Sequence, residues 1–539
     1  MNRLFLIASA AYVEPELAAE FGRLPPAFLP LGNRRLFEHQ RAALGDTPGR
    51  LLLSLPEDFS PEPSDLRRLA ELRIEVLTVP PGLTLGQSLV YVINVTATSG
   101  AGLSVLHGDT LLQGFDLAAT DTVSVASDVP PGYHWGFVRQ QEGHLEPWSG
   151  ACEAEADADG AVALTGYFCF ADAALLVQSV TRAGGAFVPG LARYATVRPL
   201  RTATAAQWFD FGHASTYHAS RQAVTTEREF NKLVARRRSI TKSGTNPRKI
   251  EAEARWFEGL PPPLRVFTPA YLGTPRSADA ASYALEYLHL PTLADLFVFG
   301  RLSRRAWDQI LAACDEFLGA CAEHHAATGD PPSAGLYLNK TLRRLERFAA
   351  TAAVSLSAPC RFGGAWLPAL EQMAHLAAAA IPDAGPGPHT LVHGDFCFSN
   401  IMYDFRAQRV RVIDPRGLDG EEQFSCFGDI RYDIGKLHHS AVGQYDFILA
   451  GAFELAQSGP LDFSLTLPDN ASTRGVRDAF LGRAFAGLRS ETAGAHPISV
   501  LLFLSMLPLH ADDPLRQRAL LANAMRLFLE LDSGGSRCG

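Results

Sequence analysis

The first 225 residues alternate between short apolar runs and longer stretches in which apolar residues recur every three or four positions. Short apolar runs bounded by polar residues are typical of buried strands, and the longer periodic stretches are typical of helices. Strands that alternate with helices favour a mostly parallel sheet, because parallel strands need a crossover connection. The pattern predicts strands at 4–7, 51–55, 74–77 and 103–106 and helices at 14–17, 63–72 and 89–94.

A different pattern follows in residues 226–539. Residues up to about 298 combine short β-rich runs with one helical stretch, 249–257, and the chain is mainly helical from about 299. Since 539 residues exceed what one hydrophobic core usually supports, we expect a second domain with a small lobe at about 226–298 and a helical lobe at about 299–539. Its predicted helices are 306–325, 341–353, 366–380, 446–456, 498–509 and 514–531.

Two short motifs in the second domain suggest its chemistry. Residues 393–400 read His-Gly-Asp-Phe-Cys-Phe-Ser-Asn, and residues 412–417 read Val-Ile-Asp-Pro-Arg-Gly. The spacing from His393 is that of a kinase catalytic loop, in which the Asp accepts the proton of the substrate hydroxyl and the Asn holds Mg²⁺. Gly, Asp and Asn are also common in ordinary turns. A second motif in the right order, after a β-like segment, favours the kinase interpretation.

These two motifs resemble the aminoglycoside phosphotransferase and choline kinase superfamily, whose members phosphorylate small molecules with ATP. The resemblance implies a protein-kinase-like, two-lobed α+β domain. It makes Asp395 the catalytic base and Asn400 and Asp414 the Mg²⁺ ligands. It also makes Asp433, in the segment 428–433, a structural carboxylate.

Kinase chemistry also needs a Lys for the nucleotide phosphates and a Glu that orients it. The segment 239–243 contains Lys242, and the helical stretch 249–257 contains Glu251 and Glu253. Two residues that are two positions apart on a helix do not face the same partner. We therefore predict a pair between Lys242 and Glu253.

The segment 283–288, Tyr-Ala-Leu-Glu-Tyr-Leu, has the pattern of a strand that follows this helix. In a kinase, the strand at this place forms the hinge whose backbone meets the adenine. The prediction places Glu286 at the nucleotide site.

Two acidic residues mark a second candidate site in the first domain. Asp109 follows the predicted strand 103–106, and Asp210 lies in the segment Trp-Phe-Asp-Phe-Gly-His at 208–213. Ligands of parallel α/β sheets collect at the carboxyl ends of the strands. Two carboxylates there can share Mg²⁺ that bridges nucleotide phosphates to an incoming phosphate nucleophile. We expect Asp109 and Asp210 to lie close together.

Together with segments 29–36 and 85–89, these residues resemble the sugar-phosphate nucleotidyltransferase family over most of residues 1–225. Members join a phosphorylated compound to a nucleoside monophosphate. The resemblance implies a mostly parallel, Rossmann-like sheet, with Asp109 and Asp210 as metal ligands. It places Gln87 and its neighbour Ser88 beside the nucleotide base.

The chain departs from this family at two positions. The family's glycine-rich loop, which receives a triphosphate on backbone N–H groups and an Arg, is replaced by Ile-Ala-Ser-Ala-Ala-Tyr at 7–12. Pro26 stands where the family has a Lys. Arg23, or else Arg34 and Arg35, would have to compensate. Otherwise the first domain is a nucleotide-binding module without catalysis.

The composition limits which kinds of partner and which cell compartment we expect for the chain. A net charge of −9 argues against a nucleic-acid surface, and the eight Cys include no C-x-x-C pair, which suits a reducing compartment. The apolar run 498–509 is too short to span a bilayer, and no secretory signal is evident, so we expect no membrane insertion and a cytoplasmic location. The expected ligands are ATP, a second nucleoside triphosphate, Mg²⁺ and a small hydroxylated acceptor.

The sequence thus predicts a bifunctional enzyme with consecutive reactions. A kinase phosphorylates a small metabolite, and a nucleotidyltransferase converts the product to a nucleoside diphosphate conjugate, with surface-glycan synthesis as the natural context. The acceptor, a sugar or an amino alcohol such as choline, stays open, and so does the second nucleotide. The alternative is a small-molecule kinase with a regulatory or assembly domain that only binds nucleotide.

Overall fold

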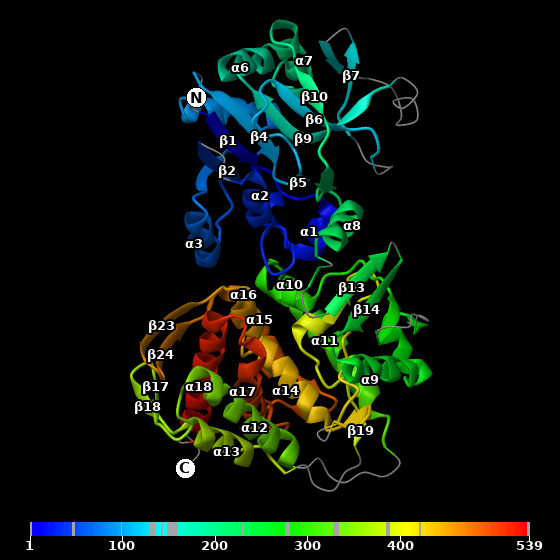
Figure 1. Cartoon of the computed structure of the whole chain (residues 1–539), viewed down its shortest axis with the longest axis vertical. Helices are drawn as coiled ribbons and strands as arrows, with labels where there is room; N and C mark the ends of the chain where they lie inside the picture. The colour runs from blue at the N-terminus through cyan, green and yellow to red at the C-terminus, as the bar shows by residue number, and fades with distance from the viewer. Residues whose placement is uncertain are drawn as a thin grey trace. The chain divides into compact units, whose positions relative to one another are not determined.

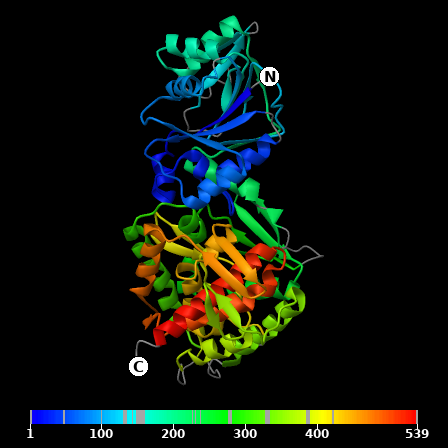
Figure 2. The same ribbon diagram turned by 90° about the vertical axis from the view of Figure 1, so that its left-hand side faces the viewer.

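The computed structural model describes residues 3–45, 49–98, 100–129, 135–141, 144–147, 160–225, 227–228, 231–236, 238–274, 281–326, 334–383, 389–419 and 422–535. The chain divides into two compact units, Met1–Val224 and Thr225–Gly539. Figures 1 and 2 show both units in two views.

The N-terminal unit is built on one large sheet with the strand order β10-β6-β9-β4-β1-β2-β3. The four strands β1 to β4 run parallel, whereas β9 runs antiparallel to β4 and β6. Leu4, Phe5, Leu6 and Ile7 of β1 are all buried, as expected of a central parallel strand covered on both faces. The strands are β1 Arg3–Ala8, β2 Arg50–Pro56, β3 Glu75–Val79, β4 Gly102–His107, β6 Thr122–Ala126, β9 Val162–Phe170 and β10 Arg201–Ala203, with the hairpin β7 Phe137–Gln141 and β8 His144–Pro147 beside β9.

Helices join these strands, and α4, α6 and α7 pack on one another. Of these, α6 and α7 are labelled in Figure 1. A second, two-stranded sheet pairs β5 (Thr110–Gln113) with β11 (Gln207–Asp210) in antiparallel register. This pairing brings together segments about a hundred positions apart in the sequence. The helices are α1 Pro15–Phe21, α2 Leu36–Leu44, α3 Pro63–Glu71, α4 Leu85–Val95, α6 Ala173–Arg182, α7 Phe187–Val197 and α8 Ala214–Thr225.

The C-terminal unit begins with a five-stranded antiparallel sheet in the order β12-β13-β14-β16-β15 and one helix, α9 (Pro247–Glu258). Ile250, Ala254 and Phe257 of α9 are buried, so the predicted apolar face is the one that packs. The Asn246 side chain caps the helix by accepting a hydrogen bond from the Lys249 N–H. The strands are β12 Glu227–Arg228, β13 Asn231–Arg236, β14 Ser239–Gly244, β15 Tyr271–Gly273 and β16 Ser282–Glu286.

The rest of this unit is mainly helical, as expected. Its centre is α17 (Ala495–Met506), which is buried along almost its whole length and packs on α12, α14 and α18 (Figure 1). Between the helices lie the hairpin β20–β21 and short sheets. The helices are α10 Leu293–Val298, α11 Arg304–Ala322, α12 Ala334–Ala352, α13 Leu370–Ala379, α14 Ile430–Ala441, α15 Tyr445–Leu449, α16 Ala471–Leu481 and α18 Pro514–Gly535. The strands are β17 Cys360–Phe362, β18 Ala365–Leu367, β19 Thr390–Leu391, β20 Ile401–Asp404, β21 Arg409–Val412, β22 Phe427–Gly428, β23 Glu454–Gly459, β24 Asp462–Thr466, β25 Ala484–Phe485 and β26 Leu488–Arg489.

The fold class is confirmed, but two predicted helices were too long. The helix expected at 366–380 begins at Leu370, because Trp366 lies in β18, which pairs with β17 across two glycines of positive φ. The helix expected at 446–456 ends at Leu449, where Gly451 has a φ of 73° and stops the helix, and Glu454 opens β23. Among the residues that the structure describes, no helix combines the length and the apolar character needed to cross a membrane.

Candidate active sites

The loop that carries Asp395 is anchored by the buried carboxylate of Asp433 on α14. Asp433 Oδ2 accepts a hydrogen bond from the His393 N–H (2.7 Å), and Oδ1 accepts one from the Gly394 N–H (2.8 Å). Burial raises the pKa of Asp433 to about 7, and the backbone donors oppose this shift. Gly394 has a φ of 77°, and a Cβ there would lie 2.7 Å from Arg416 Cβ, so the turn requires glycine.

His393 joins the two sequence motifs. Its Nε2 lies 2.9 Å from the Ile413 carbonyl oxygen, and its Nδ1 accepts the Asp395 N–H at 3.2 Å. Burial lowers the pKa of His393 to about 4, so the ring is neutral at pH 7. The neutral ring can donate from Nε2 and accept at Nδ1 at the same time, which is what this position needs.

Asp395 lies at the surface of this loop with 40% of its side chain exposed. Its Oδ1 is 2.7 Å from Lys436 Nζ, and its Oδ2 accepts a hydrogen bond from Asn400 Nδ2 at 3.1 Å. Burial of the group acts to raise the pKa of Asp395, but the charge and hydrogen bond of Lys436 outweigh it and hold the pKa below its usual range. Asp395 is therefore ionised at neutral pH and accessible to an acceptor.

Asn400 and Asp414 lie side by side at the open end of the β20–β21 hairpin. Ile401 pairs with Val412, and the Ile413 N–H donates to the Asn400 carbonyl oxygen at 3.0 Å. Asp414 has a φ of 58°, a left-handed conformation that is uncommon for residues other than glycine and often marks functional sites. Its side chain is 44% exposed.

This pair offers oxygen donors of the kind that Mg²⁺ prefers. The amide nitrogen of Asn400 is engaged by Asp395, which orients the amide oxygen away from that contact. The residues present therefore fit the predicted metal, although no group of three or more His, Cys, Asp or Glu gathers as a metal cluster within the described ranges.

Lys242 connects the small lobe to Asp414. Lys242 Nζ lies 2.7 Å from Glu253 Oε2 and 3.0 Å from Asp414 Oδ1, and the Tyr283 hydroxyl donates to the same Glu253 oxygen (2.8 Å). Burial acts to lower the pKa of Lys242, but Asp414 and Glu253 raise it above its ordinary value. Glu251 pairs instead with Arg255 at the surface. The structure thus brings together Lys242 and Glu253, and keeps Lys242 charged.

Glu286 ends strand β16 and is exposed. Its carboxylate accepts a hydrogen bond from the Ala270 N–H at 3.3 Å, and the following Tyr287 N–H donates to the Arg238 carbonyl oxygen at 3.1 Å. The chain leaves the sheet at this segment and enters α10 at Leu293. The adenine contact itself stays a prediction.

In the N-terminal unit the structure brings Asp109 and Asp210 together, across the end of the β5–β11 pair. The Phe211 N–H donates to the Asp109 carbonyl oxygen at 2.8 Å. A Cβ built on Gly212 would lie 2.9 Å from Asp109 Oδ2 and 3.4 Å from Asp210 Oδ1, so both carboxylates lie close to Gly212 and near each other. Two neighbouring carboxylates are a donor set of the kind that a divalent cation takes.

Asp210 is held in place by its neighbours. Its Oδ2 accepts hydrogen bonds from the Thr216 hydroxyl and from His213 Nδ1 (3.2 Å), which leaves Oδ1 toward Asp109. Burial and the nearby charge of Asp109 raise the pKa of Asp210. Two close carboxylates repel each other, and a bound cation would remove this repulsion.

Gln87 and Ser88 lie in the first turn of α4, away from the two Asp in sequence. Gln87 Oε1 accepts the Thr84 N–H at 2.9 Å, and the Thr84 hydroxyl accepts the Gln87 N–H, which forms a capping box. Gln87 is exposed and Ser88 is partly buried. Their contact with a base stays a prediction.

Of the three arginines that were expected to compensate for the missing glycine loop, Arg23 and Arg35 are engaged in ion pairs, whereas Arg34 is exposed. Arg23 pairs with Asp58 at 2.9 Å and lies 3.6 Å from the centre of the Tyr12 ring. Arg35 is buried and pairs with Asp65 at 2.9 Å. Arg23 and Arg34 are therefore exposed, and Arg35 is not.

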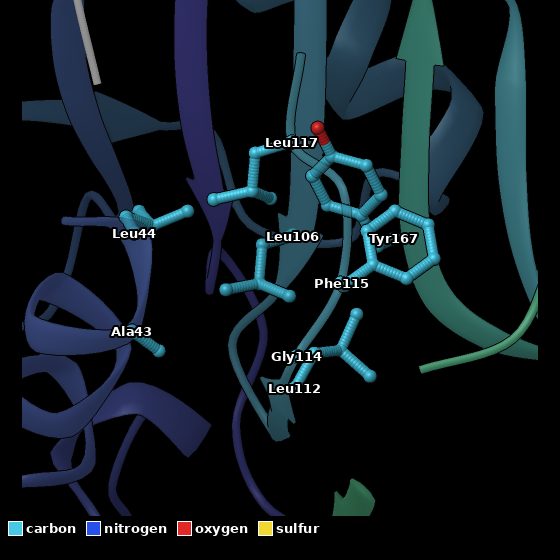
Figure 3. Close-up of a pocket in the computed structure, with 8 residues that line it drawn as sticks. All are labelled: Ala43, Leu44, Leu106, Leu112, Gly114, Phe115, Leu117 and Tyr167. Carbon is cyan, nitrogen blue, oxygen red and sulfur yellow. The ribbon is translucent and has the colours of Figure 1, made fainter. Parts of the chain in front are cut away.

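A small pocket of about 50 Å³ lies elsewhere in the N-terminal unit (Figure 3). It is lined by apolar side chains from α2, β4 and β5, and the hydroxyl of Tyr167 is the only side-chain oxygen drawn. Neither Asp109 nor Asp210 lines it. The pocket therefore offers apolar contacts and no catalytic group.

Comparison with known proteins agrees with the geometry of the C-terminal unit. Residues 212–463 match the model of the Phosphotransferase enzyme family. The C-terminal unit carries a phosphotransferase domain. A structure described as an aminoglycoside phosphotransferase from Ralstonia eutropha JMP134 is 14% identical, with a TM-score of 0.33, and the match covers 59% of this chain and 98% of that chain.

Two further solved structures are similar over about the length of the N-terminal unit. A UDP-glucose pyrophosphorylase in complex with UDP-glucose is 12% identical (TM-score 0.33; 42% of this chain and 100% of that chain). HddC from Yersinia pseudotuberculosis with GMP-PN is also 12% identical (TM-score 0.29; 41% and 99%). No curated protein sequence matches the chain.

Sequence reasoning missed two residues of these sites. Lys436, the ion-pair partner of Asp395 in the phosphotransferase domain, lies three positions after Asp433, so helical spacing would have placed it on the same side of α14. Gly212 lies close to the carboxylates of both Asp109 and Asp210. A glycine two residues after a candidate metal ligand was the available signal.

Proposed function

We propose that the phosphotransferase domain is an ATP-dependent kinase for a small hydroxylated metabolite. The observation that carries the proposal is the convergence of Asp395, Asn400, Asp414 and Lys242, each held by a specific neighbour. Phosphoryl transfer depends mainly on positioning and charge neutralisation, and these four side chains supply both.

In this proposal the hydroxyl oxygen of the acceptor attacks the γ-phosphorus of ATP, the bond from that phosphorus to the ADP oxygen breaks, and Asp395 accepts the hydroxyl proton. Lys242, oriented by Glu253, binds phosphate oxygens of the nucleotide. Asn400 and Asp414 would hold Mg²⁺, which neutralises phosphate charge when bound. The left-handed backbone at Asp414 fixes its carboxylate toward Lys242.

We further propose that the N-terminal unit is a nucleotidyltransferase that uses the kinase product. An oxygen of the phosphate monoester attacks the α-phosphorus of a second nucleoside triphosphate, and pyrophosphate leaves as the bond to the bridging oxygen breaks. Asp109 and Asp210 would hold the Mg²⁺ for this step. The nucleoside diphosphate conjugate would serve surface-glycan synthesis.

The decisive experiment is mass spectrometry of the products that the full chain forms from ATP, a second nucleoside triphosphate, Mg²⁺ and a metabolite library. The proposal expects ADP with a phosphorylated acceptor, followed by pyrophosphate with a nucleotide conjugate. In parallel, Asp414→Ala should weaken ATP affinity in the presence of Mg²⁺, and unchanged affinity would show that Asp414 is no ligand.

One observation favours the second candidate, in which the N-terminal unit only binds nucleotide. At the place of the missing glycine loop, the Ser9 N–H donates to the Ser54 hydroxyl (3.1 Å) and the Ser9 hydroxyl accepts the Ala27 N–H (3.0 Å). These groups are buried and satisfied, so they do not offer donors to a triphosphate. Release of pyrophosphate with a panel of phosphate monoesters separates the two candidates.

A further inference from the structure

Four cationic side chains, Lys340, Arg344, Arg416 and Lys436, form a cationic cluster beside Asp395. Lys340 and Arg344 are one turn apart on α12, and Lys436 lies one turn beyond Tyr432 on α14. The two helices meet here, since the rings of Tyr337 and Tyr432 lie 6.0 Å apart.

Contacts connect the cluster to the proposed catalytic base. Lys436 Nζ lies 2.7 Å from Asp395 Oδ1. The Arg416 side chain packs against Gly394, the residue before Asp395. Lys340 Nζ donates to the Tyr432 hydroxyl at 3.2 Å and lies 5.4 Å from the centre of its ring. The cationic surface therefore begins at Asp395 and continues to α12.

Most of this positive charge has no carboxylate at ion-pair distance among the described residues, and Glu422 acts on Arg344 only as a more distant charge. Within the part of the chain that the structure describes, Asp395 is the one carboxylate in an ion pair with the cluster, through Lys436. Arg344 donates to the Ser505 carbonyl oxygen (3.1 Å), and Arg416 donates to the Asp419 carbonyl oxygen (3.2 Å). By contrast, the nearby Arg431 is neutralised by Asp429 at 2.8 Å.

The pKa values of Lys340, a member of the cluster, and of its neighbour Tyr432 reflect this excess of positive charge. Burial, together with Arg416 and Arg344, lowers the pKa of Lys340 to about 8. Burial alone would raise the pKa of Tyr432, yet the charges of Lys340, Lys436 and Arg416 lower it to about 8. Partly buried cations that lack counter-charges favour an anionic ligand, because the ligand restores both charge balance and hydrogen bonds.

We propose that the acceptor of the phosphotransferase domain carries an anionic group, a phosphate or a carboxylate, which Lys340, Arg344 and Arg416 bind while the acceptor hydroxyl points to Asp395. This inference rests on the proposed kinase function and narrows its substrate class. A phosphorylated sugar or a sugar acid fits the cluster. A cationic amino alcohol such as choline does not, because the same charges repel it.

Binding tests the cluster directly. The full chain, saturated with Mg²⁺ and a non-hydrolysable ATP analogue, is titrated calorimetrically with inorganic phosphate and, separately, with glucuronate. The double variant Lys340→Met/Arg344→Met should weaken binding of at least one probe by tenfold or more. Arg343→Met, on the exposed side of the same helix, should leave it unchanged. Equal binding of both probes by wild type and the double variant overturns the proposal.

The single variant Lys340→Arg controls for misfolding. Because it keeps the positive charge, it should bind the probes almost as tightly as wild type does. The probe that loses affinity shows whether the cluster recognises phosphate or carboxylate. If Lys340→Arg loses as much affinity for the probes as the double variant does, positive charge is not what binds them, and the proposal fails.

Turnover measurements then distinguish a failure of this inference from a failure of the proposed kinase function. Wild type is assayed with glucose 6-phosphate, glucuronate, glucose and choline, with formation of ADP as the readout. Higher kcat/KM for an anionic member, lost in the double variant, supports the proposal. Preference for glucose or choline overturns it while leaving the kinase function intact. If no ATP is bound or consumed, the kinase function fails, and the calorimetry still decides whether the cluster binds anions.

Discussion

Asp395 combines two properties that seldom occur in one carboxylate: it is proposed to accept a proton, and Lys436 holds its pKa below the usual range. A carboxylate of such low pKa is a weak base. In phosphoryl transfer, however, the transition state is largely dissociative, so the alignment of the hydroxyl counts for more than basicity. Lys436 and Asn400 fix the Asp395 side chain from two directions, which serves that alignment.

The first prediction is that Asp395→Asn keeps ATP binding and loses phosphoryl transfer by roughly 10² to 10⁴-fold, the range expected for a general base. The amide keeps the size of the side chain and removes its charge. Calorimetry with ATP and Mg²⁺ and an assay of ADP formation measure the two effects. Asp308→Asn, an exposed ion-pair residue on α11, is the control. Wild-type turnover in Asp395→Asn would exclude Asp395 as the base.

The second prediction concerns pH. Lys436→Met removes the charge that lowers the pKa of Asp395, so this pKa should rise. Because the ionised form is the active one, the acid limb of the kcat/KM profile should move to higher pH, while Lys436→Arg should stay close to wild type. If kcat/KM of Lys436→Met falls at every pH but its acid limb stays at the same pH, Lys436 does not set the pKa of Asp395.

At the scale of elements, both sites are built where two strands of an antiparallel pair end. The β20–β21 hairpin sets Asn400 beside Asp414, and the β5–β11 pair sets Asp109 beside Asp210. The first pairing was predictable, because the two β-like runs are close in sequence. For the second, the position of Asp109 after a strand and the family resemblance suggested that the two Asp meet, but hydrophobic pattern does not show which distant strands pair.

The third prediction concerns Gly212, which follows the end of β11 and lies close to both Asp109 and Asp210. Gly212→Ala places a methyl group 2.9 Å from Asp109 Oδ2, closer than carbon and oxygen normally approach, and 3.4 Å from Asp210 Oδ1. Nucleotidyl transfer should fall by about tenfold or more, with a raised Mg²⁺ requirement. Gly100→Ala, where a methyl group meets no atom within 4 Å, is the control. Equal Mg²⁺ dependence in both variants would place the metal elsewhere.

At the scale of the whole molecule, the chain contains two compact units, each with its own candidate site. The alternation of strands and helices predicted the first unit's sheet, and the helical periodicity predicted most of the second unit. Short elements were harder to predict from the sequence. Trp366 was placed in a helix because its neighbours are good helix formers, but the two glycines before it form the turn of a hairpin. The cationic cluster was not predictable, because Lys340, Arg416 and Lys436 meet only through tertiary packing.

The last prediction uses this division. Asp109→Ala and Asp210→Ala should each reduce nucleotidyl transfer by roughly 100-fold or more, and the double variant should lose little beyond either one, because two carboxylates that share one cation act as a unit. Phosphorylation of the acceptor should survive all three changes, since both residues lie in the N-terminal unit. Release of pyrophosphate and formation of ADP, measured on the same preparations, report the two reactions separately. Losses that simply multiply in the double variant would show that Asp109 and Asp210 act independently, and a parallel loss of ADP formation would show that the substitutions disturb more than one site.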